Sequence, residues 1–212
     1  MLNQTLSLFI MKSFKSIMFS VSMLGMALLT SCDGDDPKPA LEATIIANLG
    51  ADPATGFDNM GHPLGTTGKF KLFSFATGAA VANTDSATNN WDIAFRGTTI
   101  IVNSGTSGPG TAAAQVVEGI FDEFITAPNA GYLQDNKNTP TYAISDWYNY
   151  ANQIITPKAG KVIIVKTAQS KYAKFEILSY YKDAPATPTN TDMPRYYKVR
   201  YIYQPDGSKN LK

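Results

Sequence analysis

Apolar and polar residues alternate along the C-terminal third of the chain with the two-residue period of a β-strand. Lys171–Tyr181 and Arg195–Tyr203 both show this alternation, and Lys161–Thr167 before them is almost entirely β-branched. A β-branched run of this kind is typical of a strand that is covered on both faces. Only Ala168–Ser170 separates Lys161–Thr167 from Lys171–Tyr181, and this is a hairpin-length connection. We therefore predict three antiparallel strands at the C-terminus.

Shorter segments upstream carry the same signal between Gly- and Thr-rich connections. The expected strands are Thr44–Ala47, Phe70–Phe75, Asn90–Arg96 and Thr98–Val102. Only Ala112–Phe124 permits a helix, and the Glu118-Gly119 pair in its middle weakens that interpretation, because glycine lowers helix propensity. Asn129–Pro157 has few aliphatic residues and is expected to be irregular. The prediction is a mainly β fold, a single domain of twisted antiparallel sheets with at most one short helix.

The N-terminal region has the layout of a secretory signal peptide. Lys12 and Lys15 precede the apolar run Ile17–Leu29, which is shorter than the roughly 20 residues needed to span a membrane. The run ends in Leu29-Thr30-Ser31-Cys32, which resembles the lipobox of bacterial lipoproteins, and Cys32 is the only cysteine in the sequence. In a lipoprotein this cysteine becomes the lipidated first residue of the mature protein. The alternative is an incidental buried cysteine that follows an ordinary signal.

These features divide the chain into three expected parts. Residues 1–31 form the lipoprotein signal peptide, residues 32–42 a flexible tether with acidic residues and proline, and residues 43–212 the folded β domain. Translation starts at Met1 or at Met11, and Met11 gives the better signal-peptide opening. We expect a lipid anchor in the outer membrane, with the domain at the cell surface. Asp33 beside the cysteine leaves the inner membrane as the alternative.

Charge and residue counts argue against several functions. Without residues 1–31 the chain has 16 basic and 17 acidic residues, which does not favour a nucleic-acid partner. His62 is the only histidine and has no serine nearby in sequence, and Cys32 is taken by lipid, so Ser-His and Cys-His catalysis and a Cys/His zinc site are not expected. Carboxylate-only catalysis remains open. Its candidates are Asp92, Asp122, Glu123 and Glu176, for which solvated surface positions are the simpler interpretation. We expect a binding protein and not an enzyme.

Aromatic residues supply the candidate ligand contacts. The sequence has 11 tyrosines, and most of them fall on expected strands, where an amphipathic strand face accounts for them. Trp147, Tyr148 and Tyr150 lie instead in the segment expected to be irregular. They are therefore candidates for a flat aromatic surface that binds a planar or sugar ligand.

Five runs stand in a characteristic order along the chain. They are Phe73–Gly78, the run Asn90-Trp91-Asp92-Ile93-Ala94-Phe95-Arg96 that continues to Asn103-Ser104-Gly105, Gly160–Lys166, Lys171–Tyr181 and Tyr201–Pro205. Together with the lipobox, they resemble the HmuY family of bacterial haem-binding lipoproteins over about Phe70 to Gly207. The resemblance implies that residues 43–212 form a HmuY-like β domain. Such a domain grips haem between loops at one end and passes it to an outer-membrane haem receptor.

The resemblance also implies two axial iron ligands, His or Met, in the irregular region that flanks the family's Trp. Here that region is Gly131–Thr156, around Trp147, and it contains no His, Met or Cys, so the family's ligand pair matches no residue of this chain. The substitutes lie elsewhere. Met60, His62 and Met193 lie in expected loops, and Tyr148 or Tyr150 could bind ferric iron as a phenolate.

Two functions remain as alternatives. The first is capture of haem or a related tetrapyrrole for iron acquisition, with the apolar area of the ligand supplying most of the affinity. The second is a HmuY-fold binding module that has lost haem binding and recognises a glycan or another small apolar ligand near Trp147 and Tyr148.

Overall fold

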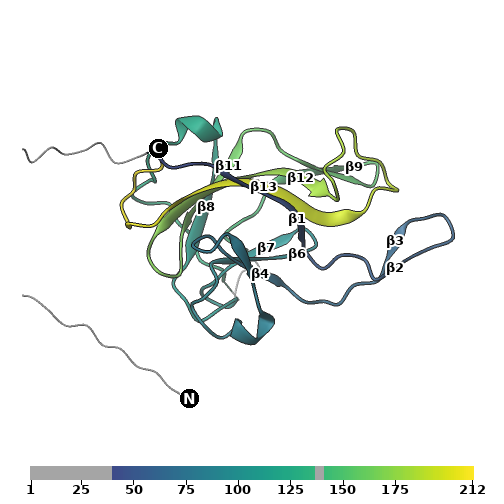
Figure 1. Cartoon of the computed structure of the whole chain (residues 1–212), viewed down its shortest axis with the longest axis horizontal. Helices are drawn as coiled ribbons and strands as arrows, with labels where there is room; N and C mark the ends of the chain where they lie inside the picture. Colours follow the sequence, from purple (N-terminus) through teal and green to yellow (C-terminus); the bar gives the residue numbers. More distant parts are fainter. Residues whose placement is uncertain (1–39, 137–140) are drawn as a thin grey trace, which may run out of the picture. The chain divides into compact units, whose positions relative to one another are not determined.

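A computed structural model describes residues 40–136 and 141–212, which form a mainly antiparallel β structure (Figure 1). The strands are β1 (Thr44–Gly50), β2 (Gly56–Phe57), β3 (Pro63–Leu64), β4 (Lys71–Ser74), β5 (Ala79–Val81), β6 (Ile93–Arg96), β7 (Thr99–Val102), β8 (Ala113–Glu118), β9 (Tyr148–Ala151), β10 (Ile154–Pro157), β11 (Lys161–Lys166), β12 (Tyr172–Tyr181) and β13 (Pro194–Gln204). Two short 3-10 turns, η1 (Asn83–Asp85) and η2 (Phe121–Glu123), are the helical elements of the described residues. The predicted fold class is confirmed. The expected signal peptide, Cys32 and the tether up to residue 39 lie outside the described residues.

Two sheets enclose the main core. One has the strand order β1-β13-β12-β11-β8, and the other has the order β5-β4-β6-β7. Aromatic side chains from both sheets meet between them: Phe95 lies 4.8 Å from Tyr197 and Phe75 lies 5.7 Å from Phe175, measured between ring centroids. The buried apolar residues of both sheets therefore form one continuous core.

The three predicted C-terminal strands are β11, β12 and β13. They pair antiparallel, with Ile163 opposite Phe175 and Phe175 opposite Tyr201. Every residue of Val162–Val165 is fully buried, because β11 lies in the interior of its sheet with apolar clusters on both faces. The β-branched run was therefore a correct signal for a strand that is covered on both sides.

The one segment that permitted a helix is a strand followed by a 3-10 turn. Ala113–Glu118 pairs antiparallel with β11, and this pairing supplies backbone partners that a sequence window cannot reveal. The following Gly119 has a φ of +153°, and a Cβ atom there would lie 2.6 Å from the ring of Phe124. Glycine thus allows the chain to leave β8 sharply and enter η2.

The segment that was expected to be irregular contains a hairpin. Within Asn129–Pro157, β9 and β10 pair antiparallel, with Ala151 opposite Ile154. The described residues of this segment that precede the hairpin form loops. In these loops the Asp135 carboxylate accepts hydrogen bonds from the backbone N–H groups of Val102 and Ala143, both at 2.9 Å.

Asp92 is fully buried, which corrects the expectation of a solvated carboxylate. Its side chain accepts hydrogen bonds from the backbone N–H groups of Phe75 at 2.9 Å and Ala168 at 3.0 Å. Burial raises the pKa of Asp92, and these two hydrogen bonds partly offset the rise. The carboxylate therefore links the β4–β5 turn to the β11–β12 turn.

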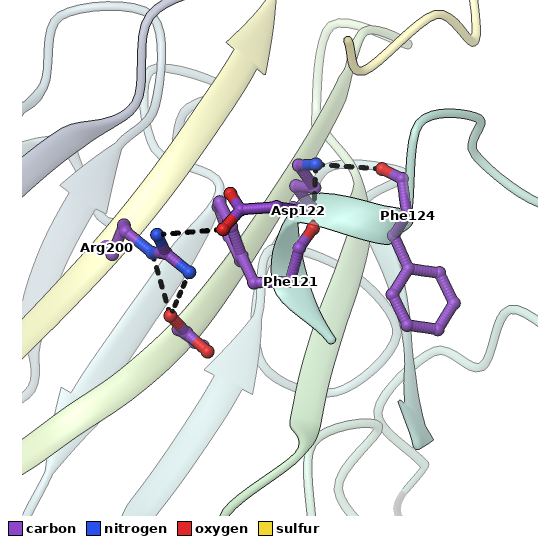
Figure 2. A network of polar contacts seen from close by, with 6 residues as sticks. Phe121, Asp122, Phe124 and Arg200 are labelled. Atoms are coloured by element: carbon purple, nitrogen blue, oxygen red, sulfur yellow. Dashed lines mark hydrogen bonds and ion pairs between the residues drawn. The ribbon is translucent and has the colours of Figure 1, made fainter. Parts of the chain in front are cut away.

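A second, smaller core lies under η2. Lys174 on β12 is 1% exposed, and its Nζ donates hydrogen bonds of 2.9 Å to the carbonyl oxygens of Phe121 and Phe124. Figure 2 shows Arg200 reaching Asp122 beside the ring of Phe121. The Arg200 guanidinium lies 4.2 Å from the centroid of that ring and also pairs with Glu176 at 2.8 Å.

The two ends of the described domain meet beside this second core. The backbone N–H of Leu41 donates to the carbonyl oxygen of Lys212 at 3.1 Å, and Leu211 is fully buried. No helix in the described ranges is long and apolar enough to cross a membrane.

Candidate ligand-binding site

A cavity of about 610 Å³ opens where five stretches of chain meet. They are the β1–β2 connection at Asp52, the β3–β4 connection at Thr66 and Gly68, the β6–β7 turn at 96–99, the β9–β10 hairpin at Gln153 and Ile155, and the β12–β13 connection within 180–195. Figure 1 shows the β9 hairpin beside the yellow-green connection that leads into β13. Small-molecule pockets have volumes of roughly 300–1,000 Å³, so this cavity is large enough for an organic ligand.

Buried aromatic residues support the cavity wall. Trp147 is 2% exposed, and its Nε1–H donates to the carbonyl oxygen of Thr98 at 3.1 Å. Its ring lies 6.0 Å from that of Tyr180 and 5.4 Å from that of Tyr197. Thr98 and Tyr180 both line the cavity. Trp147 contacts both residues, and it therefore helps to position this part of the cavity wall.

The β9–β10 hairpin forms one rim. Its two-residue turn, Asn152-Gln153, has positive φ at both positions, 50° and 65°, as a type I′ turn requires. The backbone N–H of Ile155 donates to the hydroxyl of Tyr181 at 2.9 Å, which ties the hairpin to β12.

Arg195 lines the cavity in a strained backbone conformation. Its φ is 68°, a left-handed value that costs a non-glycine residue about 1–2 kcal/mol. The pairing of β12 with β13 is irregular here, since Tyr181 lies opposite Pro194 and Ser179 lies opposite Lys198. The irregularity lets the guanidinium turn toward the loops, where Nη1 donates to the carbonyl oxygens of Asp52 at 3.2 Å and Gly65 at 3.4 Å. Strained residues that the surrounding structure holds in place are often found at functional sites.

The acidic residues of the lining are engaged by neighbouring donors. The Asp52 carboxylate accepts from the N–H and hydroxyl of Thr67, each at 2.7 Å, and from the N–H of Gly68 at 2.9 Å. Burial alone would raise the pKa of Asp52, but these hydrogen bonds and the charge of Arg195 lower it below its usual range. Asp192 accepts from the N–H and the hydroxyl of Thr189, at 2.7 and 2.8 Å.

Two tyrosines of the lining are neutral at physiological pH. Burial raises the pKa of Tyr180 to about 12, and Arg195 beside it limits the rise. Burial also raises the pKa of Tyr181, although the hydrogen bond from Ile155 lowers it in part. Both side chains therefore present neutral phenols to a ligand.

The candidate residues named from the sequence are dispersed around this site. Tyr148 packs on Trp147 with 4.7 Å between ring centroids, and Tyr150 is 66% exposed on β9. Met193 is half-buried between Asp192 and Pro194, which both line the cavity. Met60 and His62 lie in the β2–β3 turn, outside the lining, and His62 Nδ1 lies 2.8 Å from the Asp58 carboxylate.

Sequence reasoning missed the charged part of the site. Arg96 and Arg195 both line the cavity, yet they appear in the sequence only as ends of predicted strands. The sequence contains one indication of this part of the site, the small number of arginines. There are three: Arg96, Arg195 and Arg200.

A second cavity, of about 510 Å³, is less suited to a ligand. Its charged lining residues pair with one another: Lys161 contacts Glu118 at 2.7 Å and Asp146 at 3.3 Å. The positive and negative charges of this lining therefore neutralise one another, and no charged group of these described residues is left to bind a ligand.

A comparison with protein-family models gives a match over most of the described domain. The family model of the HmuY protein matches residues 67–196, more than half of the chain, and this span includes most of the stretches that line the 610 Å³ cavity. A search of curated proteins found no match.

Solved structures show weaker similarity. The apo HmuY analogue of Tannerella forsythia has a TM-score of 0.44 and 14% identity over 81% of this chain and 100% of its own. A proposed HmuY-like haem-binding protein of Bacteroides vulgatus has a TM-score of 0.45 and 18% identity over 76% of this chain and 90% of its own. A proposed lipoprotein of Bacteroides fragilis has a TM-score of 0.43 and 14% identity over 77% of this chain and 90% of its own. The extent of the family-model match carries the assignment: this chain belongs to the HmuY family.

Proposed function

We propose that this protein is a lipid-anchored binding protein that captures haem or a related tetrapyrrole in the 610 Å³ cavity. One observation carries the proposal: in a chain of the HmuY family, the hairpin that follows Trp147 and the loop before β13 frame one cavity of ligand size. The proposed anchor is Cys32, and the proposed location is the outer membrane, facing the cell surface, where the protein would deliver its ligand to an outer-membrane haem receptor.

The lining matches the organic part of haem better than its iron. Ile155, Tyr180 and Tyr181 offer apolar and aromatic area to a planar macrocycle, and the two arginines suit its carboxylates. Among the described residues that line the cavity there is no His, Met or Cys. Met193 is the proposed iron contact, because both of its neighbours in sequence line the cavity; Met60 and His62 are more distant candidates.

In this proposal the aromatic residues have different roles. Trp147 is a positioning residue, since it is buried behind Thr98 and Tyr180. Tyr148 supports Trp147, and the exposed Tyr150 is free to contact a ligand that extends beyond the hairpin. Capture would rest mainly on removal of apolar area from water, at roughly 25 cal/mol per Å².

A haem titration of the full-length chain tests this function. We expect a shift of the Soret band that saturates, and we expect Thr99→Trp to weaken it because the larger side chain fills the cavity. Thr156→Trp is the matched control, since Thr156 is exposed on β10 and outside the lining. Equal binding by the two variants would place haem elsewhere, and Met193→Ala reports whether the thioether contributes to the band.

The polar part of the lining favours one alternative. Thr66, Thr189, Asn190 and Gln153 supply hydroxyl and amide groups of the kind that bind sugars. A module that had lost haem binding would therefore recognise a glycan here. In that case haem would give no Soret shift, while a glycan would quench tryptophan fluorescence in the wild-type chain but not in Thr99→Trp.

A further inference from the structure

Two of the three arginines of the chain converge on the cavity. Arg96 enters from the end of β6 and Arg195 from the beginning of β13, and these positions are 99 residues apart in sequence. The third, Arg200, lies outside the lining and has two carboxylate partners, Glu176 at 2.8 Å and Asp122 at 3.3 Å.

The cavity arginines are oriented without being neutralised. Arg96 Nη1 donates to the carbonyl oxygen of Gly68 at 3.3 Å, and the guanidinium lies 4.3 Å from the ring centroid of Phe70. Arg195 is held by the backbone carbonyls of Asp52 and Gly65. Within residues 40–136 and 141–212, no carboxylate lies within the 4.0 Å ion-pair distance of either guanidinium. Neither guanidinium is therefore balanced by a directly paired carboxylate, and each has N–H donors and no acceptor.

The nearby acids do not cancel this charge by direct pairing. Both oxygens of Asp52 accept hydrogen bonds from Thr67 and Gly68, so its carboxylate is turned into its own loop. Asp192 accepts hydrogen bonds from the N–H and the hydroxyl of Thr189, both through Oδ2. The lining thus contains two guanidiniums, and its two carboxylates accept hydrogen bonds from residues of their own loops.

The backbone of Arg195 supports the same conclusion. A left-handed φ of 68° is unfavourable for arginine, and the irregular β12–β13 pairing holds it there. Glycine would relieve this strain, whereas arginine keeps a guanidinium at the rim.

We propose that Arg96 and Arg195 form a carboxylate-binding subsite of the cavity, so that its ligand is a ring-containing organic acid. The assignment of the cavity as the binding site rests on the proposed function. The two guanidiniums in the lining add the chemical class of the ligand. A guanidinium fork forms two parallel hydrogen bonds with a carboxylate, which fixes the orientation of the ligand and selects acids over neutral rings.

The first test compares haem with its dimethyl ester, which lacks free carboxylates, on the full-length chain. We expect the ester to bind about tenfold more weakly, because charge-assisted hydrogen bonds are lost. Arg96→Gln and Arg195→Gln should each weaken haem about tenfold and reduce the preference for haem over the ester. Equal affinity for haem and ester in the wild-type chain would overturn the subsite and leave haem capture standing.

The second test does not depend on haem. In 15N-labelled full-length chain, glutarate should shift the side-chain Nε–H resonances of Arg96 and Arg195 and leave that of Arg200 in place, since Arg200 is already paired. Unmoved resonances at Arg96 and Arg195, or equal shifts at all three, would overturn the subsite. A selective response to glutarate without any haem binding would support the subsite and overturn the proposed ligand instead.

Discussion

Asp92 shows how one buried carboxyl group can organise turns from different sheets. Its carboxylate has no exposed surface, and it accepts hydrogen bonds from Phe75 and Ala168, which are 93 residues apart in sequence. Desolvation of the charged form is unfavourable, as the raised pKa records. The hydrogen bonds from the two backbone N–H groups offset part of this cost. They also give partners to two N–H groups that would otherwise be buried without one.

We expect Asp92→Asn to destabilise the domain by about 1–3 kcal/mol. The amide keeps one acceptor oxygen but places an NH₂ group against the second backbone donor, so one hydrogen bond is replaced by an unfavourable contact. The free energy of unfolding from urea denaturation measures the effect. Glu123→Gln is the control, because Glu123 is exposed, and it should change stability by less than about 0.5 kcal/mol. An equally small effect of Asp92→Asn would contradict the linking role.

Individual site residues were only partly predictable from the sequence. The aromatic cluster at Trp147 was found because aromatic residues are conspicuous in a segment poor in aliphatics. Its inward orientation was not, because the two-residue period gives a direction only within a strand and Trp147 precedes β9. Arg195 read as the start of a regular strand, since nothing in the sequence reveals a left-handed residue at an irregular pairing.

Among the elements, η2 depends on β12 for its position. Its turn contains a single buried residue, Phe121, and the Lys174 ammonium joins the Phe121 and Phe124 carbonyls to the sheet. Burial lowers the pKa of Lys174, which is the direction expected for an ammonium removed from water. The alternation of Lys171–Tyr181 predicted this strand, but it could not predict that its lysine points into a second core.

Lys174→Met should destabilise the domain by about 1–3 kcal/mol, because two carbonyl acceptors lose their donor. Urea denaturation gives the free energy, and faster hydrogen exchange at residues 121–125 would locate the change in η2. Lys198→Met on the neighbouring strand is a matched control, since Lys198 is half-buried and shows no polar partner among the residues described. Loss of stability without faster local exchange would show that Lys174 acts on the sheet alone.

In the turn of the β9–β10 hairpin we expect a substitution to stabilise the domain. Gln153 occupies the second position of a type I′ turn with a φ of 65°, where glycine is favoured. Gln153→Gly should therefore stabilise the domain by about 0.5–1 kcal/mol, visible as a higher midpoint of thermal unfolding. Gln153→Ala removes the same side chain but keeps the Cβ atom, and it should give no gain. A gain from alanine as well would mean that the glutamine side chain, and not the backbone, is the source of strain.

At the scale of the whole molecule, buried and half-buried tyrosines set the alkaline limit of stability. Burial raises the pKa of five of them: Tyr132 and Tyr180 to about 12, and Tyr181, Tyr197 and Tyr203 above the ordinary value of 10.0. A folded-state pKa above the unfolded value gives stability that is complete below pH 10.0 and is lost as the pH rises toward 12. Lys174 acts in the opposite direction, but it is a single group.

We therefore expect cooperative unfolding between about pH 10 and pH 12, in which tyrosinate absorbance and loss of the β-sheet circular dichroism signal change together. The reason is that these phenols must enter water before they can ionise. Independent ionisation of all tyrosines near pH 10, with the circular dichroism unchanged, would contradict this expectation. A titration at high salt is a useful control, because screening should affect the exposed charges more than the buried phenols.

The overall architecture could be predicted only in part. Local periodicity identified β11, β12 and β13, because each strand carries its own pattern. It did not predict that β1 closes the edge of the sheet beside β13, nor that β8 flanks β11, since both pairings join segments distant in sequence. The cavity is formed by such distant segments, and for that reason it could not be located from the sequence.

Strand β13 separates the chain entry point from the ligand cavity. Pro194 and Arg195 at its start line the cavity, whereas the Gln204 side chain at its end donates to the carbonyl oxygen of Asn210, close to where Leu41 meets Lys212. Eleven residues of extended strand span about 35 Å. The first described residues of the domain and the cavity therefore lie at opposite ends of β13, so a ligand reaches the cavity at the end of the strand that is remote from Leu41.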